Sequence, residues 1–220
     1  VFMKKFLAVI VLALPLFLVG CGQKEFELKD YMSEITNVYY QAEGDGVNAS
    51  VSVGQREVDY KVNGVHGSVC DFTLIEVKFD EVKNQDAMEI EVVIDGTSQP
   101  FMLEFNPLTD VFVGDLGYAV ESGASISLVI EGQRLDMVNI TDELISSSEA
   151  LEIARLALID EIASCYSGGV FCGECYLKLL HERGSSFNQL FWSFSLVCVQ
   201  GVKYDVVINA QTGEVVGENL

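Results

Sequence analysis

The sequence predicts a mainly β protein with two folded units. The first is an immunoglobulin-like antiparallel β-sandwich over residues 38–141, and the second is an α+β unit, one helix on a small antiparallel sheet, over residues 142–220. Short segments with apolar residues at alternate positions fill the first range, as in half-buried strands. The second range begins with a helix-start pattern, and the apolar residues that follow recur with a period near 3.6, as on one face of a helix. Half of all residues are hydrophobic, which excludes a disordered chain.

The first unit is expected to contain strands alone. In Thr73–Val82, for example, Ile75, Val77 and Phe79 alternate with charged or polar residues. Short strands separated by turns, with no helical stretch between them, are typical of an antiparallel sandwich. The turn sequences include Asp95-Gly96, Asn106-Pro107 and Glu131-Gly132. The expected strands are Asn37–Ala42, Val47–Val53, Val58–Val62, Thr73–Val82, Met88–Ile94, Phe101–Phe105, Val111–Leu116, Ser125–Ile130 and Arg134–Ile140.

The second unit begins with a capping box, in which Ser146 accepts a hydrogen bond from the Glu149 amide and the Glu149 carboxylate reaches back. A helix is expected to continue to about Ser164 and to end before Gly168-Gly169. Its apolar face consists of Leu151, Ala154, Leu158, Ile162 and Cys165. The expected strands are Cys175–His181, Leu190–Gln200, Lys203–Ala210 and a short one at Val215-Val216.

The first two of these strands are expected to pair so that all their large apolar groups face the helix. A slip of one residue would turn the whole set toward water. The register that satisfies this condition places opposite each other Cys175 and Cys198, Leu177 and Leu196, Leu179 and Phe194, and His181 and Trp192.

Three segments of the second unit, taken together, carry a resemblance to a known family. They are Ser148-Glu149-Ala150 with Ala154, Trp192-Ser193-Phe194, and the run from Tyr204 to Val215. Together they resemble the opening helix, the aromatic strand and the closing signature of PepSY domains, over about residues 142–220. That family is associated with propeptides of secreted thermolysin-like metallopeptidases and with cell-envelope proteins. The resemblance implies protein binding, including inhibition or regulation of a secreted peptidase, without catalysis. The cysteine-bearing insertion at 165–175 departs from the family pattern.

Residues 1–20 are predicted to be a signal peptide. Lys4 and Lys5 precede an apolar run from Phe6 to Val19, which is too short to cross a hydrocarbon core of about 30 Å. The end of this run and the cysteine after it, Leu18-Val19-Gly20-Cys21, resemble the lipobox of bacterial lipoproteins. The resemblance implies cleavage before Cys21 and attachment of lipid, including palmitate, to that residue. Residues 21–37 would then be a tether, and the protein would lie on the extracytoplasmic face of a cell membrane.

The composition limits the classes of partner. The formal net charge of −20 repels nucleic acid and anionic lipid headgroups. A nucleic-acid partner is therefore excluded, and membrane attachment is expected through the lipid. A protein partner is expected and no cofactor is predicted, while the oligomeric state and the type of envelope do not follow from the sequence.

The cysteines after Cys21 are expected to form disulfides, because an envelope protein folds in an oxidising compartment. The predicted pairs are Cys175–Cys198, across the hairpin, and Cys165–Cys172, at the helix exit. Cys70 is then left as a buried thiol.

Three alternatives stay open. Cys172 and Cys175 have the spacing of a thiol-redox pair, although the βαβ frame of such motifs is missing. A zinc site would take Cys165, Cys172, Cys175 and either Cys198 or His181, although structural zinc usually takes two close pairs of ligands. The β-sandwich could instead bind a glycan or another small ligand.

No catalytic residues are predicted, and the protein is not expected to be an enzyme. His66 and His181 fall in different predicted units, so neither completes a set with a serine and an acid. Val65-His66-Gly67-Ser68 lacks the strand-to-helix turn that surrounds a nucleophilic serine.

Overall fold

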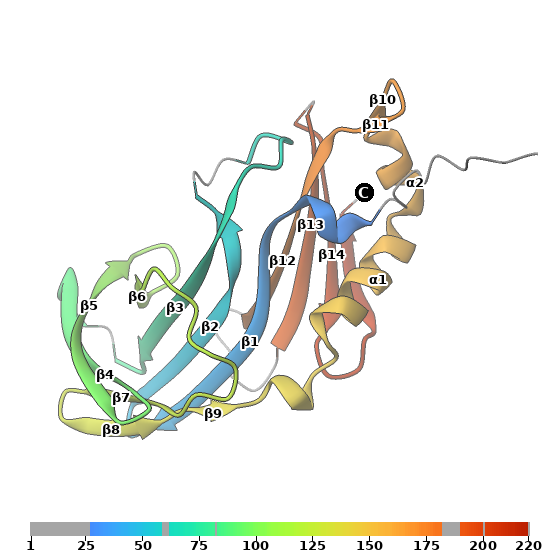
Figure 1. Ribbon diagram of the computed structural model, residues 1–220. Helices are drawn as coiled ribbons and strands as arrows, with labels where there is room; N and C mark the ends of the chain where they lie inside the picture. Colours follow the sequence, from blue (N-terminus) through green and yellow to red (C-terminus); the bar gives the residue numbers. More distant parts are fainter. Residues whose placement is uncertain (1–26, 59–61, 82, 182–189, 200, 220) are drawn as a thin grey trace, which may run out of the picture.

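A computed structural model of the chain describes residues 27–58, 62–81, 83–181, 190–199 and 201–219 (Figure 1). Within them, one mixed sheet of 13 strands has the order β15-β14-β13-β12-β1-β2-β3-β6-β5-β4-β7-β8, and β9 pairs with β1. Its strands are β1 (Met32–Gly44), β2 (Val47–Glu57), β3 (Val69–Phe79), β4 (Ala87–Ile94), β5 (Thr97–Asn106), β6 (Val111–Asp115), β7 (Ile126–Ile130), β8 (Gln133–Asp136), β9 (Val138–Asn139), β12 (Gly173–His181), β13 (Leu190–Cys198), β14 (Lys203–Asn209) and β15 (Val215–Asn219). The remaining elements are the hairpin of β10 (Tyr166–Ser167) and β11 (Val170–Phe171), the 3-10 helices η1 (Leu28–Tyr31) and η2 (Thr141–Glu143), and the helices α1 (Ser147–Ala157) and α2 (Ile159–Ser164).

The predicted fold class, an immunoglobulin-like sandwich followed by a PepSY-like helix-on-sheet domain, is wrong, because a single sheet runs through both ranges. Strand β1 joins the two parts. It pairs antiparallel with β2, where Ile35 lies opposite Gln55, and parallel with β12, where Ile35 lies opposite Leu177. This parallel pair joins strands from opposite ends of the chain, and no local sequence pattern reports such a pairing.

Near its centre, β1 is buried on both faces. Tyr39 is 1% exposed and belongs to a core shared with the helices, whereas Tyr40 is 2% exposed and belongs to a second core formed within β1–β8. Successive side chains of a strand point to opposite faces, so this one strand contributes a tyrosine to each core.

The second core lies inside a curl of the sheet. Strands β1 to β8 bend round so that their inner faces meet (Figure 1), and β9 closes the curl by pairing with β1, with Asn139 opposite Tyr40. Ile75, Leu103 and Leu128 are fully buried inside it. The packing is sandwich-like, but both layers belong to the same sheet.

Helices α1 and α2 cover one face of β12–β14 (Figure 1). Ser146 caps α1, with the Glu149 amide donating to its hydroxyl over 3.1 Å, so this half of the predicted capping box is confirmed. The buried helical residues are Ala150, Ala154, Leu158, Ile162 and Cys165, close to the predicted face. At the far end of the same core, the Trp192 indole donates to the Ile145 carbonyl over 3.1 Å.

The β12–β13 register differs by two residues from the predicted one. Leu179 lies opposite Trp192, Leu177 opposite Phe194, Cys175 opposite Leu196, Gly173 opposite Cys198 and His181 opposite Leu190. A shift of two residues keeps every side chain on its original face, so the apolar residues still meet the helices. The burial requirement therefore fixes the face but leaves the register along the strand open.

Several predicted segments change their extent. Residues 28–37, assigned to the tether, form η1 and the first part of β1. The predicted strand Val58–Val62 includes residues 59–61, which lie outside the described residues, as do the signal peptide and Cys21. Among the helices that the structure describes, none has the length and apolar character needed to span a membrane.

The fold predicts a pH dependence of stability from Glu76, a half-buried residue of β3. Burial raises the pKa of this carboxyl, and the hydrogen bond from Ser50, 3.4 Å, offsets the shift only in part. A raised pKa means that the folded state keeps the proton longer than the unfolded state, so stability falls as the pH rises above about 4.5 through the folded-state pKa. We expect Glu76→Gln to have a higher Tm than the unsubstituted chain at pH 7 and a smaller change in Tm between pH 4 and pH 7.

The measurement is thermal unfolding followed by circular dichroism at both pH values. Glu104→Gln is the control, because Glu104 is an exposed residue of the neighbouring part of the sheet. Equal Tm changes with pH in Glu76→Gln and in the unsubstituted chain would contradict the assignment to Glu76.

Candidate functional site

An open groove of about 680 Å³ lies between the N-terminal end of the described chain and the helices. Three separate segments form it: η1, β1 and the α1–α2 pair. Its volume falls within the range of ligand-binding sites, about 300–1,000 Å³. The apolar residues that line it are Leu28, Ile35, Leu151, Ile159 and Ile162.

Charged residues of both signs edge this groove in two ion pairs. Lys29 contacts Glu27 in the first, and Arg155 donates two hydrogen bonds to the Glu152 carboxylate, over 2.6 and 2.7 Å, in the second. The guanidinium of Arg155 lowers the pKa of Glu152 through these bonds. Surface pairs of this kind contribute little to stability, so charged groups of a ligand can replace one partner of each pair at small cost.

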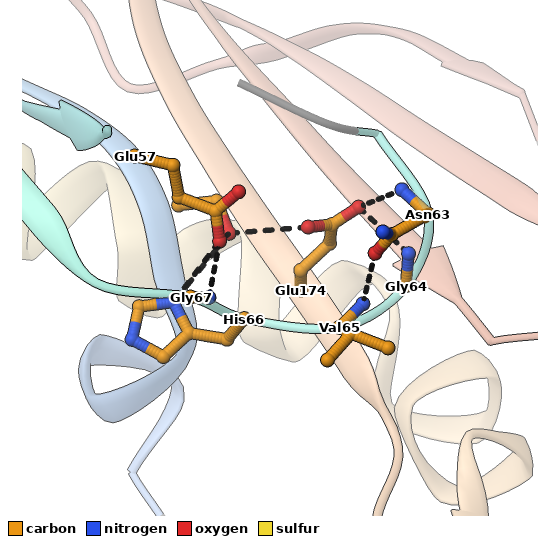
Figure 2. Close-up of polar contacts among 8 residues, drawn as sticks. Glu57, Asn63, Gly64, Val65, His66, Gly67 and Glu174 are labelled. Atoms are coloured by element: carbon orange, nitrogen blue, oxygen red, sulfur yellow. Dashed lines mark hydrogen bonds and ion pairs between the residues drawn. The ribbon is translucent and has the colours of Figure 1, made fainter. Parts of the chain in front are cut away.

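A buried polar cluster lies on the opposite face of the sheet from the helices (Figure 2). It consists of Ser33 at the start of β1, Glu57 at the end of β2, His66 between β2 and β3, and Glu174 at the start of β12. Ser33 and Glu174 are 0% exposed and Glu57 is 5% exposed. Buried carboxylates are stable only with hydrogen bonds or opposite charges around them, and the cluster supplies such partners.

Glu174 accepts hydrogen bonds on both of its carboxylate oxygens. One carboxylate oxygen accepts from the backbone amides of Asn63 and Gly64, each over 2.7 Å. The other accepts from the Ser33 hydroxyl over 3.2 Å. The carboxylate therefore ties segment 62–68 to β12.

Glu57 holds the same segment from its other end. It accepts from the Gly67 amide and, over 2.7 Å, from the Ser33 hydroxyl. The His66 ring nitrogen Nδ1 lies 3.8 Å from the same carboxylate and can form an ion pair with it when protonated. Because a hydroxyl has one proton, Ser33 donates to Glu57 or to Glu174, but not to both at once.

This cluster brings a serine, a histidine and two acids together, a combination that the sequence analysis did not predict. The geometry differs from a catalytic relay, in which the histidine lies between the serine and the acid. Here the same nitrogen of His66 faces both Ser33, at 3.4 Å, and Glu57. Ser33 is also inaccessible to a substrate. The cluster therefore positions a loop and provides no exposed nucleophile.

Segment 62–68 also packs closely against the end of β13. Gly64 has a φ of +78°, and a Cβ at this position would collide with the backbone of Cys198 and Val199. The side chain of Asn63 accepts from the Val65 amide over 3.0 Å and closes the turn. The dipeptide Asn63-Gly64 is a turn signal that the sequence analysis did not use and that could have located this loop.

The structure has a disulfide between Cys165 and Cys198, whose Cα atoms are 5.4 Å apart. The predicted pairs Cys175–Cys198 and Cys165–Cys172 are wrong. The two-residue shift in register places Gly173 opposite Cys198, while α2 brings Cys165 to the end of β13. The bridge joins the helical layer to the sheet.

Three cysteines of the described residues are free. Cys175 is fully buried, and burial raises the pKa of its thiol, which disfavours the reactive thiolate. Cys172 is half-buried, and Cys70 is exposed rather than buried as predicted. The disulfide takes up Cys165 and Cys198, two residues of the zinc alternative, and the described residues contain no group of three or more His, Cys, Asp or Glu side chains placed to hold a metal ion.

Two smaller hollows lie on the curled part of the sheet. One, of about 390 Å³, is lined by acidic residues around Lys83, and the other, of about 380 Å³, lies beside Phe101 and Met102. Each has a single aromatic residue in its lining, Phe79 in the first and Phe101 in the second, whereas a pocket lined by several aromatic residues would favour glycan binding by this part. Comparisons of the chain with protein-family models, with curated proteins and with solved structures gave no match.

We predict that Glu174→Ala destabilises the protein, because it leaves the backbone amides of Asn63 and Gly64 without their acceptor. The expected loss in free energy of unfolding is about 2–4 kcal/mol, measured by urea denaturation. Glu104→Ala, a change at an exposed strand position, is expected to stay within about 0.5 kcal/mol of the unsubstituted chain. A similar small loss for Glu174→Ala would show that the buried contacts do not hold the loop.

Proposed function

We propose that this chain is a lipid-anchored, non-enzymatic protein of the bacterial cell envelope that binds a segment of another protein in the groove beside its anchor. The groove is the observation that carries the proposal. It combines an apolar floor with a rim of both charges, the composition expected of a site for a peptide with mixed side chains.

The apolar surface extends beyond the groove, which favours a protein over a small molecule. Leu156, which does not line the groove, is 57% exposed, and Ile159, which lines it, is 56% exposed. They follow Glu152 and Arg155 at three- and four-residue steps, so the four side chains share one side of the helical layer. Exposed apolar residues that continue a groove are typical of protein-binding surfaces.

The lipid anchor is supported by the leader sequence, and it would determine where the groove lies relative to the membrane. Residues 22–28 connect Cys21 to η1, and a chain of that length reaches at most about 25 Å. An anchor at Cys21 would therefore keep the groove close to the membrane. A secreted peptidase, the partner class implied by the sequence resemblance, is one protein that would meet the groove there.

We expect Cys21→Ser to abolish lipid attachment. Cells grown with radiolabelled palmitate should label the unsubstituted chain and not Cys21→Ser, because the cysteine sulfur is the acceptor. Cys70→Ser is the control, and this exposed thiol can be changed without loss of label. Label that persists in Cys21→Ser, or an unsubstituted chain without label, would contradict the anchor.

For the groove, we expect Ile159→Asp to reduce recovery of the partner in pull-downs from envelope and secreted fractions with the full-length chain in detergent. A charge at an apolar contact of an interface commonly costs about tenfold in affinity or more. Leu108→Asp is the matched control, because Leu108 is an exposed leucine in the turn between β5 and β6. Equal recovery with the two variants would place the binding surface elsewhere.

A further inference from the structure

We infer that one end of the molecule contacts the lipid bilayer through a cluster of exposed valines, here called the valine tip. The inference rests on the proposed lipid anchor and adds a second contact with the membrane. The valine tip consists of Val58, Val62, Val65, Val69, Val170, Val199 and Val202, which are between 39% and 65% exposed.

These valines come from three connections that meet at one end of the sheet. Val58 to Val69 lie in and beside the β2–β3 connection, Val170 lies in the β10–β11 hairpin, and Val199 and Val202 lie between β13 and β14. The segments are in contact: the Val199 amide donates to the Cys172 carbonyl over 3.2 Å. Figure 1 shows the three connections at the end of the sheet where β1 begins.

The buried cluster determines which residues of the β2–β3 connection face outward. Glu174 and Glu57 hold the backbone of segment 62–68 through its amides (Figure 2). With the polar backbone groups turned inward, the side chain of Val65 points to solvent and is 58% exposed. The fold thus uses buried carboxylates to keep apolar side chains at the surface.

The tether enters at this same end. The ring of Tyr31 in η1 lies 4.7 Å from that of Phe171 at the end of β11, and Met32 lies opposite Cys175 near the start of β12. With at most about 25 Å of chain between Cys21 and η1, a lipid on Cys21 holds this end toward the bilayer.

Charge also favours a lipid contact at the valine tip. Two ion pairs lie beside the valines: Arg56 pairs with Asp115, and Lys203 pairs with Asp205 at 2.9 Å. The carboxylate of Asp71 keeps its charge and accepts a hydrogen bond from Gln55 over 2.9 Å. The net charge of −20 opposes approach to anionic lipid elsewhere on the molecule. Valines beside ion pairs suit the interface of a zwitterionic membrane, where apolar side chains enter the boundary between headgroups and acyl chains.

The test is quenching of tryptophan fluorescence by brominated lipid. Trp192, the single tryptophan of the sequence, is buried, so a new tryptophan at an exposed position adds a distinct signal. Val65→Trp and, as the control, Leu108→Trp are prepared as lipidated full-length chains in phosphatidylcholine vesicles with or without bromine on the acyl chains. Leu108 follows β5 at the opposite end of β3 from Val69.

We expect the added fluorescence of Val65→Trp to fall about twofold in brominated vesicles, because the interface lies within about 10 Å of the acyl chains, and that of Leu108→Trp to stay unchanged. Vesicle flotation tests the lipid anchor separately from the membrane contact of the valine tip. Chains that float without quenching at Val65→Trp would overturn the valine tip and leave the anchor intact, whereas chains that do not float would overturn both. Loss of partner recovery in Val65→Ser, without quenching in Val65→Trp, would show a protein interface and overturn the lipid contact.

Discussion

Strand β1 hydrogen-bonds to β2 along one edge and to β12 along the other, and it sends Tyr39 and Tyr40 into two different cores. The curled part and the helix-covered part therefore cannot separate without breaking a buried strand pair. The groove depends on this arrangement, because Ile35 of β1 forms part of its floor. The polar cluster also depends on the position of β1, because Ser33 of this strand lies between the carboxylates of Glu57 and Glu174.

Local structure could be predicted where one face of an element is buried. Alternation in segments such as Thr73–Val82 and the cap at Ser146 led to strands and a helix close to those observed. The connection of β1 to β12 could not be predicted, because it depends on hydrogen bonds between distant backbones. The β12–β13 register failed for a related reason: registers two residues apart bury the same side chains, so burial cannot distinguish Cys175 from Gly173 as the partner of Cys198.

The candidate site was less predictable than the elements that form it. The groove is built from η1, β1 and the helices, and the first of these was assigned to a tether. The sequence analysis gave no role to Glu174, although it is the buried acceptor of the cluster. A carboxylate in a strand of alternating apolar and polar residues is normally predicted to be exposed to solvent. Glu174 is buried because segment 62–68, which is distant in sequence, folds over it.

The bridge from Cys165 to Cys198 connects the end of the helical layer to the strand end beside Val199. A partner pulling on the helices would transmit its force through this covalent bond directly to the end of the sheet where the chain enters. The hydrophobic contacts between helices and sheet would be spared most of that load. A protein built in this way resists mechanical detachment of its helices from the sheet.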